Sequence, residues 1–201
     1  GTSIGSSGDR PAALNELVGI ILNDGVRFPT WRVEELHFAR DTPWETRMVR
    51  EGAQGERVMD PAVARILREA MVDVVDQGTA RRVRGVIRAP GGTPLEVGGK
   101  TGTGDNRYRV FGAGGRLIES RSVNRTSTFV FFIGDRYYGV ISAYVPGDEA
   151  DRYHFTSALP TQILRELAPV IEGLLQEDAT AAASGAGGGG PAATGPGPTT
   201  P

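Results

Sequence analysis

The sequence predicts a mixed α+β domain in which helices flank an antiparallel sheet. Two segments, 11–21 and 61–75, place apolar residues at the i, i+3, i+4, i+7 spacing of amphipathic helices. Two β-branched and aromatic runs, 128–133 and 137–145, are joined by a short glycine-containing turn, as in a β-hairpin. A further apolar helical segment, 155–175, can then cover one face of the sheet.

The N-terminal half is expected to hold two helices and a short pair of strands. The first helix starts at Pro11 and ends at Asn23, Asp24 and Gly25. Residues 31–38 read as a strand, and 46–49 return beside it. The second helix starts at Asp60-Pro61, a capping carboxylate followed by proline at the first helical position, and is closed by Gly78. We interpret its apolar stripe as core packing: Val63, Ile66, Leu67, Ala70, Met71, Val74 and Val75.

The C-terminal half is expected to hold the sheet. Residues 97–103 predict a strand, and the glycine- and arginine-rich segment 104–125 is expected to be a long loop. Gly139 within the last strand indicates a bulge or a close approach by another group. Pro160 and Pro169 are expected to break or kink the last helix.

Composition divides the chain and limits its function. Residues 1–178 are expected to fold, whereas 179–201 contain only Ala, Gly, Pro, Thr and Ser and predict a disordered tail. The net charge of −2 argues against a nucleic-acid partner. The absence of cysteine excludes disulfides and thiol catalysis, and His37 and His154 lack metal-ligand spacing, so we expect neither a metal nor a cofactor. No apolar run could span a bilayer, and because the chain starts at Gly1 rather than Met, we expect its true start to be missing.

The lone lysine of the chain lies in a glycine-rich segment. Of 22 basic residues only Lys100 is lysine, in the sequence Gly-Gly-Lys-Thr-Gly-Thr-Gly over 98–104. A phosphate-binding P-loop would need glycine where Pro94 stands and would have to open a helix. The other interpretation is a strand at an active-site edge. There the Lys100 ammonium and the Thr103 hydroxyl would point into one cleft and suit a carboxylate. Gly102 would leave room for an extended substrate, and the Thr103 N–H could be an oxyanion donor.

Lys-Thr-Gly at 100–102 is the pattern that penicillin-recognising serine enzymes carry on such a strand. Further segments keep the order and approximate spacing of the transpeptidase domains of penicillin-binding proteins. They are Ser3–Ser6, Pro11–Leu14, Asn23–Pro29, Arg57–Pro61, Ile66–Leu67, Val74–Val75, Gly78–Ala80 and Gly99–Thr103. Over about residues 3–145 the sequence therefore resembles the C-terminal portion of such a domain, most like the class A branch.

The resemblance implies an incomplete serine β-lactamase/transpeptidase-like fold with a role in bacterial peptidoglycan biosynthesis. The activity implied is that of a penicillin-binding D,D-transpeptidase, with Lys100 catalytic and Thr101, Gly102 and Thr103 binding substrate. The implied partners are peptidoglycan stem peptides, β-lactams and the missing N-terminal part of the same protein. The implied location is the periplasmic face of the inner membrane, with membrane attachment only through that N-terminal part.

The sequence departs from the family in its nucleophile. Ser-x-x-Lys cannot occur, because Lys100 is the sole lysine and Val97 stands at the serine position, so we expect the chain alone to be inactive. Ser122-Val123-Asn124 matches the family's Ser-x-Asn pattern but follows Lys100, so we interpret it as coincidence in an arginine-rich, solvated loop. The alternatives are a non-catalytic carboxylate- or peptide-binding module of the same fold and a P-loop protein, and transpeptidase and carboxypeptidase activity both remain open.

Overall fold

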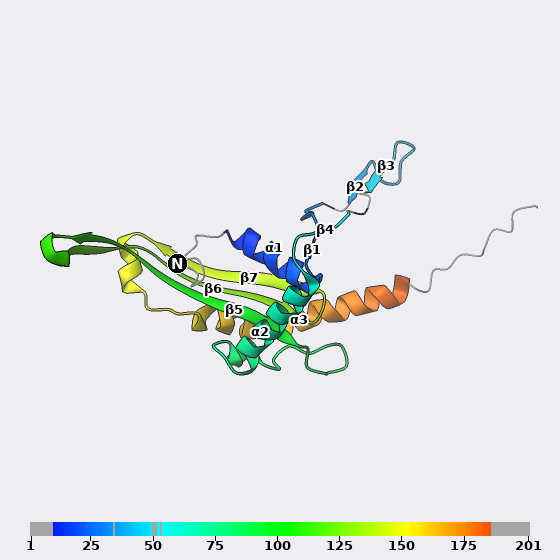
Figure 1. The fold of residues 1–201 in the computed structure, drawn as a ribbon. Coiled ribbons are helices and arrows are strands. Elements are labelled where there is room, and N and C mark those ends of the chain that lie inside the picture. Colours follow the sequence, from blue (N-terminus) through cyan, green and yellow to red (C-terminus); the bar gives the residue numbers. More distant parts are fainter. Residues whose placement is uncertain (1–9, 34, 50–51, 53, 186–201) are drawn as a thin grey trace, which may run out of the picture.

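A three-stranded antiparallel sheet forms the centre of the molecule, with helices on both faces (Figure 1). The computed structural model describes residues 10–33, 35–49, 52 and 54–185 of the 201-residue chain. The sheet order is β5-β6-β7, with β5 spanning Val97–Phe111, β6 Leu117–Ile133 and β7 Tyr137–Pro146. The helices are α1 (Pro11–Leu22), α2 (Pro61–Asp76) and α3 (Ala158–Gly185). The predicted mixed fold of helices around an antiparallel sheet is confirmed.

Local signals position the first two helices as predicted. Helix α1 ends where Asp24 and Gly25 adopt φ of 50° and 86°, a left-handed conformation that stops a helix. Helix α2 starts at Pro61, and the Asp60 side chain accepts a hydrogen bond from the Ala62 N–H at 2.7 Å. The end of α1 and the start of α2 therefore follow from the residues at these positions.

Two small antiparallel pairs lie between α1 and α2 in the sequence. Strand β1 (Val26–Arg27) pairs with β4 (Glu56–Arg57), and β2 (Glu35–Phe38) pairs with β3 (Thr46–Val49). The predicted strand at 46–49 is confirmed, whereas the strand predicted over 31–38 occupies only its last residues.

The sheet carries a separate apolar core on each face. Phe129, Phe131 and Ile133 of β6 pack on the side of α3, together with Leu164 and Ala168 of that helix. On the opposite face Phe132 packs against α1 and α2, with contributions from Val18, Ile21 and Met71. The two cores follow from the alternation of side chains along a strand that is covered on both sides.

The apolar stripe of α2 is only partly in the core. Ala64, Met71 and Val75 are buried, whereas Val63, Ile66 and Leu67 are 47%, 65% and 37% exposed. The prediction that the whole stripe is core packing is therefore wrong for these three residues and for Ala70, which is also exposed. Amphipathicity identifies the face that a helix offers to a partner, but the described part of the chain leaves this portion uncovered.

The predicted loop at 104–125 is wrong, because these residues continue the strands. Strand β5 runs on to Phe111, and β6 begins at Leu117 after a 3₁₀ turn, η3 (Ala113–Gly115). Gly114 and Gly115 take φ of 74° and 75° in that turn, which suits glycine. The segment mixes polar and apolar residues on both faces, so it lacks the apolar alternation of a half-buried strand, and cross-strand pairing keeps it extended.

The β6–β7 hairpin forms at the predicted residues, and its register is regular from Ile133↔Tyr137 to Asn124↔Pro146. A Cβ on Gly139 would lie 2.9 Å from the Phe131 ring, so this glycine permits a close approach and there is no bulge. Helix α3 is not broken: Pro160 lies in its first turn and Pro169 within it. It also continues through residues 179–185, past the predicted start of the tail, and 186–201 lie outside the described residues. None of the described helices is long and apolar enough to cross a membrane.

Candidate functional site

The residues around Lys100 lie on β5 at the free edge of the sheet. Among the described strands, β5 pairs only with β6, and Lys100 is opposite Val130 in an antiparallel register. Because Gly134 N–H donates to the Glu96 carbonyl at 2.8 Å, the even-numbered residues from 96 to 104 direct their backbone groups toward β6. The backbone N–H and C=O groups of Thr101 and Thr103 consequently face away from the sheet, along its open edge.

Hydrogen bonds from two other segments fix the threonine side chains. Thr101 is 9% exposed, and its Oγ1 lies 2.6 Å from Oγ1 of Thr79, just beyond α2. The N–H of Ser157, which precedes α3, donates to Thr103 Oγ1 at 2.9 Å. Since Thr103 Oγ1 accepts this bond, its own hydrogen remains able to donate to another group.

Lys100 belongs to the opposite face of the strand. It is exposed, its partner Val130 packs with the core formed by α1 and α2, and its Nζ donates to the Thr101 carbonyl at 2.5 Å. The Lys100 and Thr103 side chains, expected to meet in one cleft, leave the strand on opposite faces. Residues separated by an odd number of positions lie on opposite faces of a strand, so the two groups can meet only around its open edge.

The glycines of this segment have two different roles. A Cβ on Gly98 would lie 2.3 Å from Phe132 Cε1, and one on Gly99 would lie 2.4 Å from Phe129 Cε2, so both positions are closed by aromatic rings. A Cβ on Gly102 would have only the Thr128 carbonyl oxygen nearby, at 4.0 Å. Gly98 and Gly99 therefore serve packing, whereas Gly102 leaves open space beside the strand.

The P-loop interpretation is wrong. Lys100 lies inside a strand that continues to Phe111, whereas a P-loop lysine lies at the start of a helix with its backbone N–H groups cradling phosphate. The arrangement here is instead an extended edge with one ammonium and free backbone donors and acceptors. Such an edge can add an extended peptide as a further strand and bind its carboxylate.

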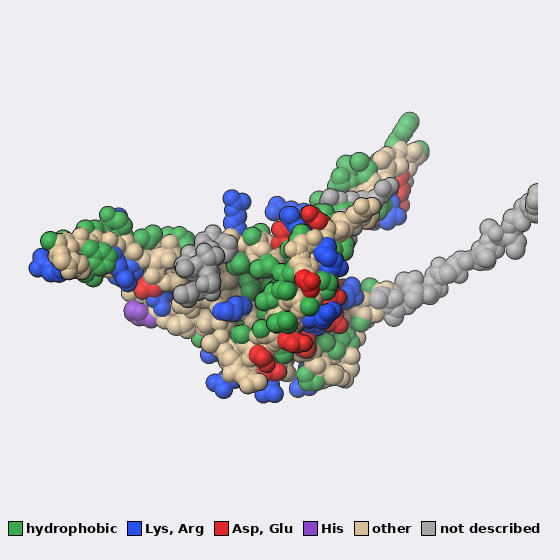
Figure 2. Space-filling model, viewed as in Figure 1, with side chains coloured by type: hydrophobic (Ala, Val, Ile, Leu, Met, Phe, Trp, Pro, Cys, Tyr) green, Lys and Arg blue, Asp and Glu red, His purple; other side chains and the backbone are tan. Residues whose placement is uncertain are grey.

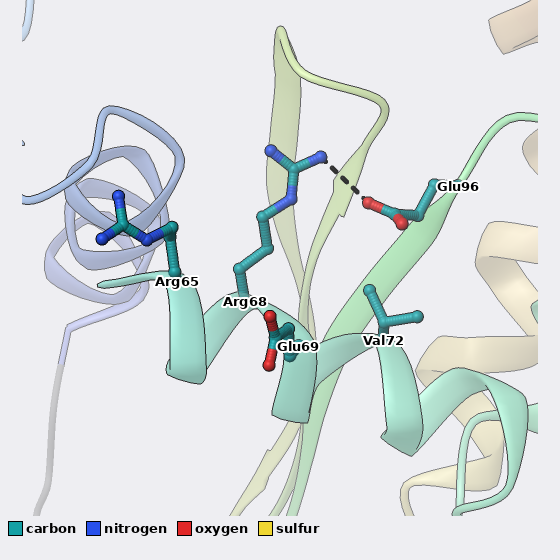
Figure 3. Close-up of a pocket in the computed structure, with 5 residues that line it drawn as sticks. All are labelled: Arg65, Arg68, Glu69, Val72 and Glu96. Carbon is teal, nitrogen blue, oxygen red and sulfur yellow. Dashed lines mark hydrogen bonds and ion pairs between the residues drawn. The ribbon is translucent and has the colours of Figure 1, made fainter. Parts of the chain in front are cut away.

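A cluster of ion pairs around Arg68, which the sequence did not indicate, holds the beginning of β5 (Figure 3). Arg68 of α2 donates to Glu96 at 2.9 Å and to Asp135 at 2.6 Å, and its guanidinium lies 5.2 Å from the centre of the Phe132 ring. Burial opposes the charged form, but the hydrogen bonds to Asp135 and Glu96 outweigh it and raise the pKa of Arg68. The partners lie far apart in the sequence, so no local pattern could have revealed this cluster.

Ser122 and Asn124, the residues of the Ser-x-Asn match, are both on β6. Ser122 is 2% exposed, and its buried Oγ has no hydrogen-bond partner in the described part of the chain. Asn124 accepts a 2.7 Å hydrogen bond from Asn106 on β5. The bond between Asn106 and Asn124 joins β5 to β6. Neither Ser122 nor Asn124 lies beside Lys100, whose partner on β6 is Val130.

Two arginines of the supposed solvated loop have defined partners. Arg107 donates to Asp151 at 2.6 Å, and this bond raises the pKa of Arg107. Arg125 donates to the Phe155 carbonyl at 2.9 Å. The 3₁₀ segment η4 (Asp148–Arg152) and the approach to α3 are thus tied to the sheet through these side chains. Among the described residues, no group of His, Asp and Glu is arranged to hold a metal ion.

Comparison with known protein families decides the assignment. The model of the penicillin binding protein transpeptidase domain matches residues 11–113, just over half of the chain. The chain belongs to this family. The matched range of this transpeptidase-family chain includes α1, α2 and the whole of β5, and therefore the Lys100–Thr103 edge. No curated protein matches the chain.

Solved structures of the family share the fold of this transpeptidase-family chain. Penicillin-binding protein A of Mycobacterium tuberculosis, as a ceftriaxone acyl-enzyme, is 24% identical with a TM-score of 0.53, and the match covers 83% of this chain and 34% of that one. Another structure of that protein is also 24% identical, with a TM-score of 0.50, and the match covers 83% of this chain and 34% of that one. Penicillin-binding protein 3 of M. tuberculosis, complexed with aztreonam, is 19% identical with a TM-score of 0.50, and the match covers 82% of this chain and 34% of that one. The chain thus spans about a third of the length of these neighbours.

Proposed function

We propose that the chain is the C-terminal part of a peptidoglycan D,D-transpeptidase that binds penicillin and supplies the substrate-binding strand but not the nucleophile. The observation that carries the proposal is the placement of Lys-Thr-Gly-Thr on the open edge of β5, in a chain of the transpeptidase family. The remaining machinery, including Ser-x-x-Lys, would come from an N-terminal part of the same protein.

In this proposal the stem peptide lies along β5 as an added strand. Its backbone pairs with the outward-facing Thr101 N–H and Thr103 C=O groups, which leaves the Thr103 N–H for the oxyanion, and Gly102 leaves it room. The terminal carboxylate is held by the Thr101 and Thr103 segment and attracted by the Lys100 ammonium. The available hydrogen of the Thr103 hydroxyl is one donor to it.

The chemistry proposed is acyl transfer through a serine. A serine of the N-terminal part attacks the D-Ala–D-Ala carbonyl carbon, its proton passes to the lysine of its own motif, and the Thr103 N–H stabilises the oxyanion. The C–N bond breaks, the terminal D-Ala leaves as an amine after protonation, and an ester to the serine remains. An amine of a neighbouring stem peptide then attacks this ester and restores the serine. Lys100 contributes to the electrostatics and to the proton relay.

The partner proposed for the uncovered apolar residues of α2 is the N-terminal part of the same protein. Val63, Ile66 and Leu67 are exposed on the helix that packs beside β5, and the chain spans about a third of its structural neighbours. Covering these residues would bring that part next to the Lys100 edge. We further propose that the enzyme acts at the outer face of the bacterial inner membrane, attached through that N-terminal part.

A second candidate function is a non-catalytic module that binds carboxylate-bearing peptides at the same edge. The absence of Ser-x-x-Lys from the chain favours it. The two functions differ in one outcome: a transpeptidase forms a covalent penicilloyl adduct once its nucleophile is present, and a binding module never does.

The test uses a fluorescent penicillin and intact-mass spectrometry. The chain alone should give no adduct, and the full-length protein from which it comes should be acylated on the serine of Ser-x-x-Lys. A stoichiometric adduct on any serine of the isolated chain, or none on the full-length protein, would contradict the proposal.

Lys100→Arg in the full-length protein tests the role of the lysine. Arginine keeps the charge but cannot release a proton, so acylation should slow by at least about 10²-fold. Ser122→Ala is the matched control and should leave acylation unchanged, because Ser122 Oγ is buried away from Lys100. An unchanged rate in Lys100→Arg would show that the lysine has no such role.

A further inference from the structure

The β5–β6 hairpin extends well beyond the rest of the sheet. Its strands have 15 and 17 residues, longer than the usual 3–10, and β7 pairs with β6 only as far as Asn124. The portion from Tyr108 to Arg121, here called the hairpin tip, therefore has two strands only. Figure 1 shows it projecting from one end of the molecule. Just before the tip, Arg107 forms an ion pair with Asp151 of η4.

The hairpin tip combines apolar and basic side chains. Tyr108, Phe111, Leu117 and Ile118 are 49–62% exposed. Arg109 and Arg116 are exposed beside them, and Arg121 lies over the Tyr108 ring at 5.0 Å. Figure 2 shows green apolar and blue basic side chains gathered together at this end. A two-stranded ribbon that leaves its large apolar side chains in water is only marginally stable, which indicates that something covers the tip.

We propose that the hairpin tip docks on the surface of a bilayer that contains anionic lipids. The tip is much smaller than the roughly 20–30 residues that each side of a standard protein interface contributes. Shallow insertion of a few aromatic and aliphatic side chains needs no such area. The guanidinium groups of Arg109 and Arg116 suit phosphate groups, to which arginine donates paired hydrogen bonds, and aromatic rings favour the interfacial region. Charge complementarity therefore favours an anionic bilayer.

The test is flotation of the 201-residue chain with lipid vesicles, because bound protein rises with the vesicles whereas aggregates sink. The chain should float with mixed phosphatidylglycerol–phosphatidylcholine vesicles and should lose this binding at high salt or with phosphatidylcholine alone. Phe111→Ser/Leu117→Ser/Ile118→Ser should reduce binding at least 10-fold. Arg109→Gln/Arg116→Gln should reduce it roughly 30-fold at low salt, since each basic residue near an anionic surface contributes about 5-fold.

Two matched controls remove an equal number of similar side chains elsewhere. Phe38→Ser/Trp44→Ser/Met48→Ser acts on the β2–β3 hairpin, which is also exposed and apolar, and Arg81→Gln/Arg165→Gln removes two other exposed arginines. Both should float like the parent chain. A variant in which Asn-Gly replaces residues 109–120, joining Tyr108 to its cross-strand partner Arg121, should keep the parental circular dichroism and lose flotation.

Several outcomes would overturn the proposal. One is no flotation of the parent chain with any vesicle, and another is loss of flotation in the β2–β3 variant while the tip variants still float. A third is self-association in solution that the tip variants abolish while flotation is absent, which would show that a second copy covers the tip. These readouts do not involve penicillin acylation, so the proposal stands or falls separately from the transpeptidase function.

Discussion

Gly99 should be intolerant of even a methyl group, and the structure allows the size of the effect to be estimated. In Gly99→Ala the new Cβ would lie 2.4 Å from Phe129 Cε2 and 2.6 Å from the Val130 carbonyl oxygen, well inside ordinary contact. Phe129 is fully buried and Val130 is held in the β5–β6 ladder, so neither can move aside freely. Overpacking of this kind costs about 1–3 kcal/mol, and the entropic gain of replacing glycine returns only about 0.4–1 kcal/mol.

The expected net loss is about 1–2 kcal/mol in the free energy of unfolding, measured by urea denaturation followed by circular dichroism. Gly102→Ala is the matched control on the same strand: its nearest neighbour would be 4.0 Å away, and neither glycine has a positive φ. That variant should remain within about 0.5 kcal/mol of the parent chain. Equal midpoints for the two variants would refute the argument that aromatic packing, rather than the open edge, requires glycine at 99.

Three further predictions concern hydrogen bonds. Asp60→Ala removes the cap of α2 and should cost about 1 kcal/mol in urea denaturation, whereas Asp60→Asn should restore most of it. Thr101→Val should cost about 1 kcal/mol in the same assay, because the hydrogen bond between the Thr101 and Thr79 hydroxyls is lost, and Thr101→Ser should not. The Tyr137 hydroxyl donates to Asp178, which raises the pKa of Tyr137 above 10.0. The stabilisation from this hydrogen bond should thus be complete below pH 10 and lost as the pH rises through the raised pKa. In Tyr137→Phe, the free energy of unfolding measured against pH should no longer show this loss.

Elements that begin or end at capping or turn residues could be predicted from the sequence. Asp60-Pro61 defines the start of α2, and Gly134 at φ 58° defines the β6–β7 turn, because both depend on residues adjacent in the chain. The length of β5 and β6 could not be predicted. Beyond Gly104 polar and apolar residues are mixed on both faces, and only the pairing of one strand with the other shows that they are extended.

The sequence indicated the candidate site residues but not their geometry. Residue types and spacing indicated Lys100, Thr101 and Thr103, and the strand period alone could have placed Lys100 and Thr103 on opposite faces. The contacts of Thr101 with Thr79 and of Thr103 with Ser157 join segments distant in the sequence. Only the folded structure can reveal such contacts.

The dependence of the sheet on α3 has a consequence for the order of folding. One of the two cores is closed by Leu164, Ala168 and Leu175, and the residue that fixes Thr103 immediately precedes α3. During synthesis, β5 to β7 leave the ribosome before these residues, so one apolar face of the sheet stays only partly covered, by residues such as Val83 and Ile87, until α3 docks. The Lys100 edge therefore acquires its final shape in the last folding step. Exchange of the Ser157 amide hydrogen, which donates to Thr103 Oγ1, should accordingly report the docking of α3 rather than the formation of the sheet.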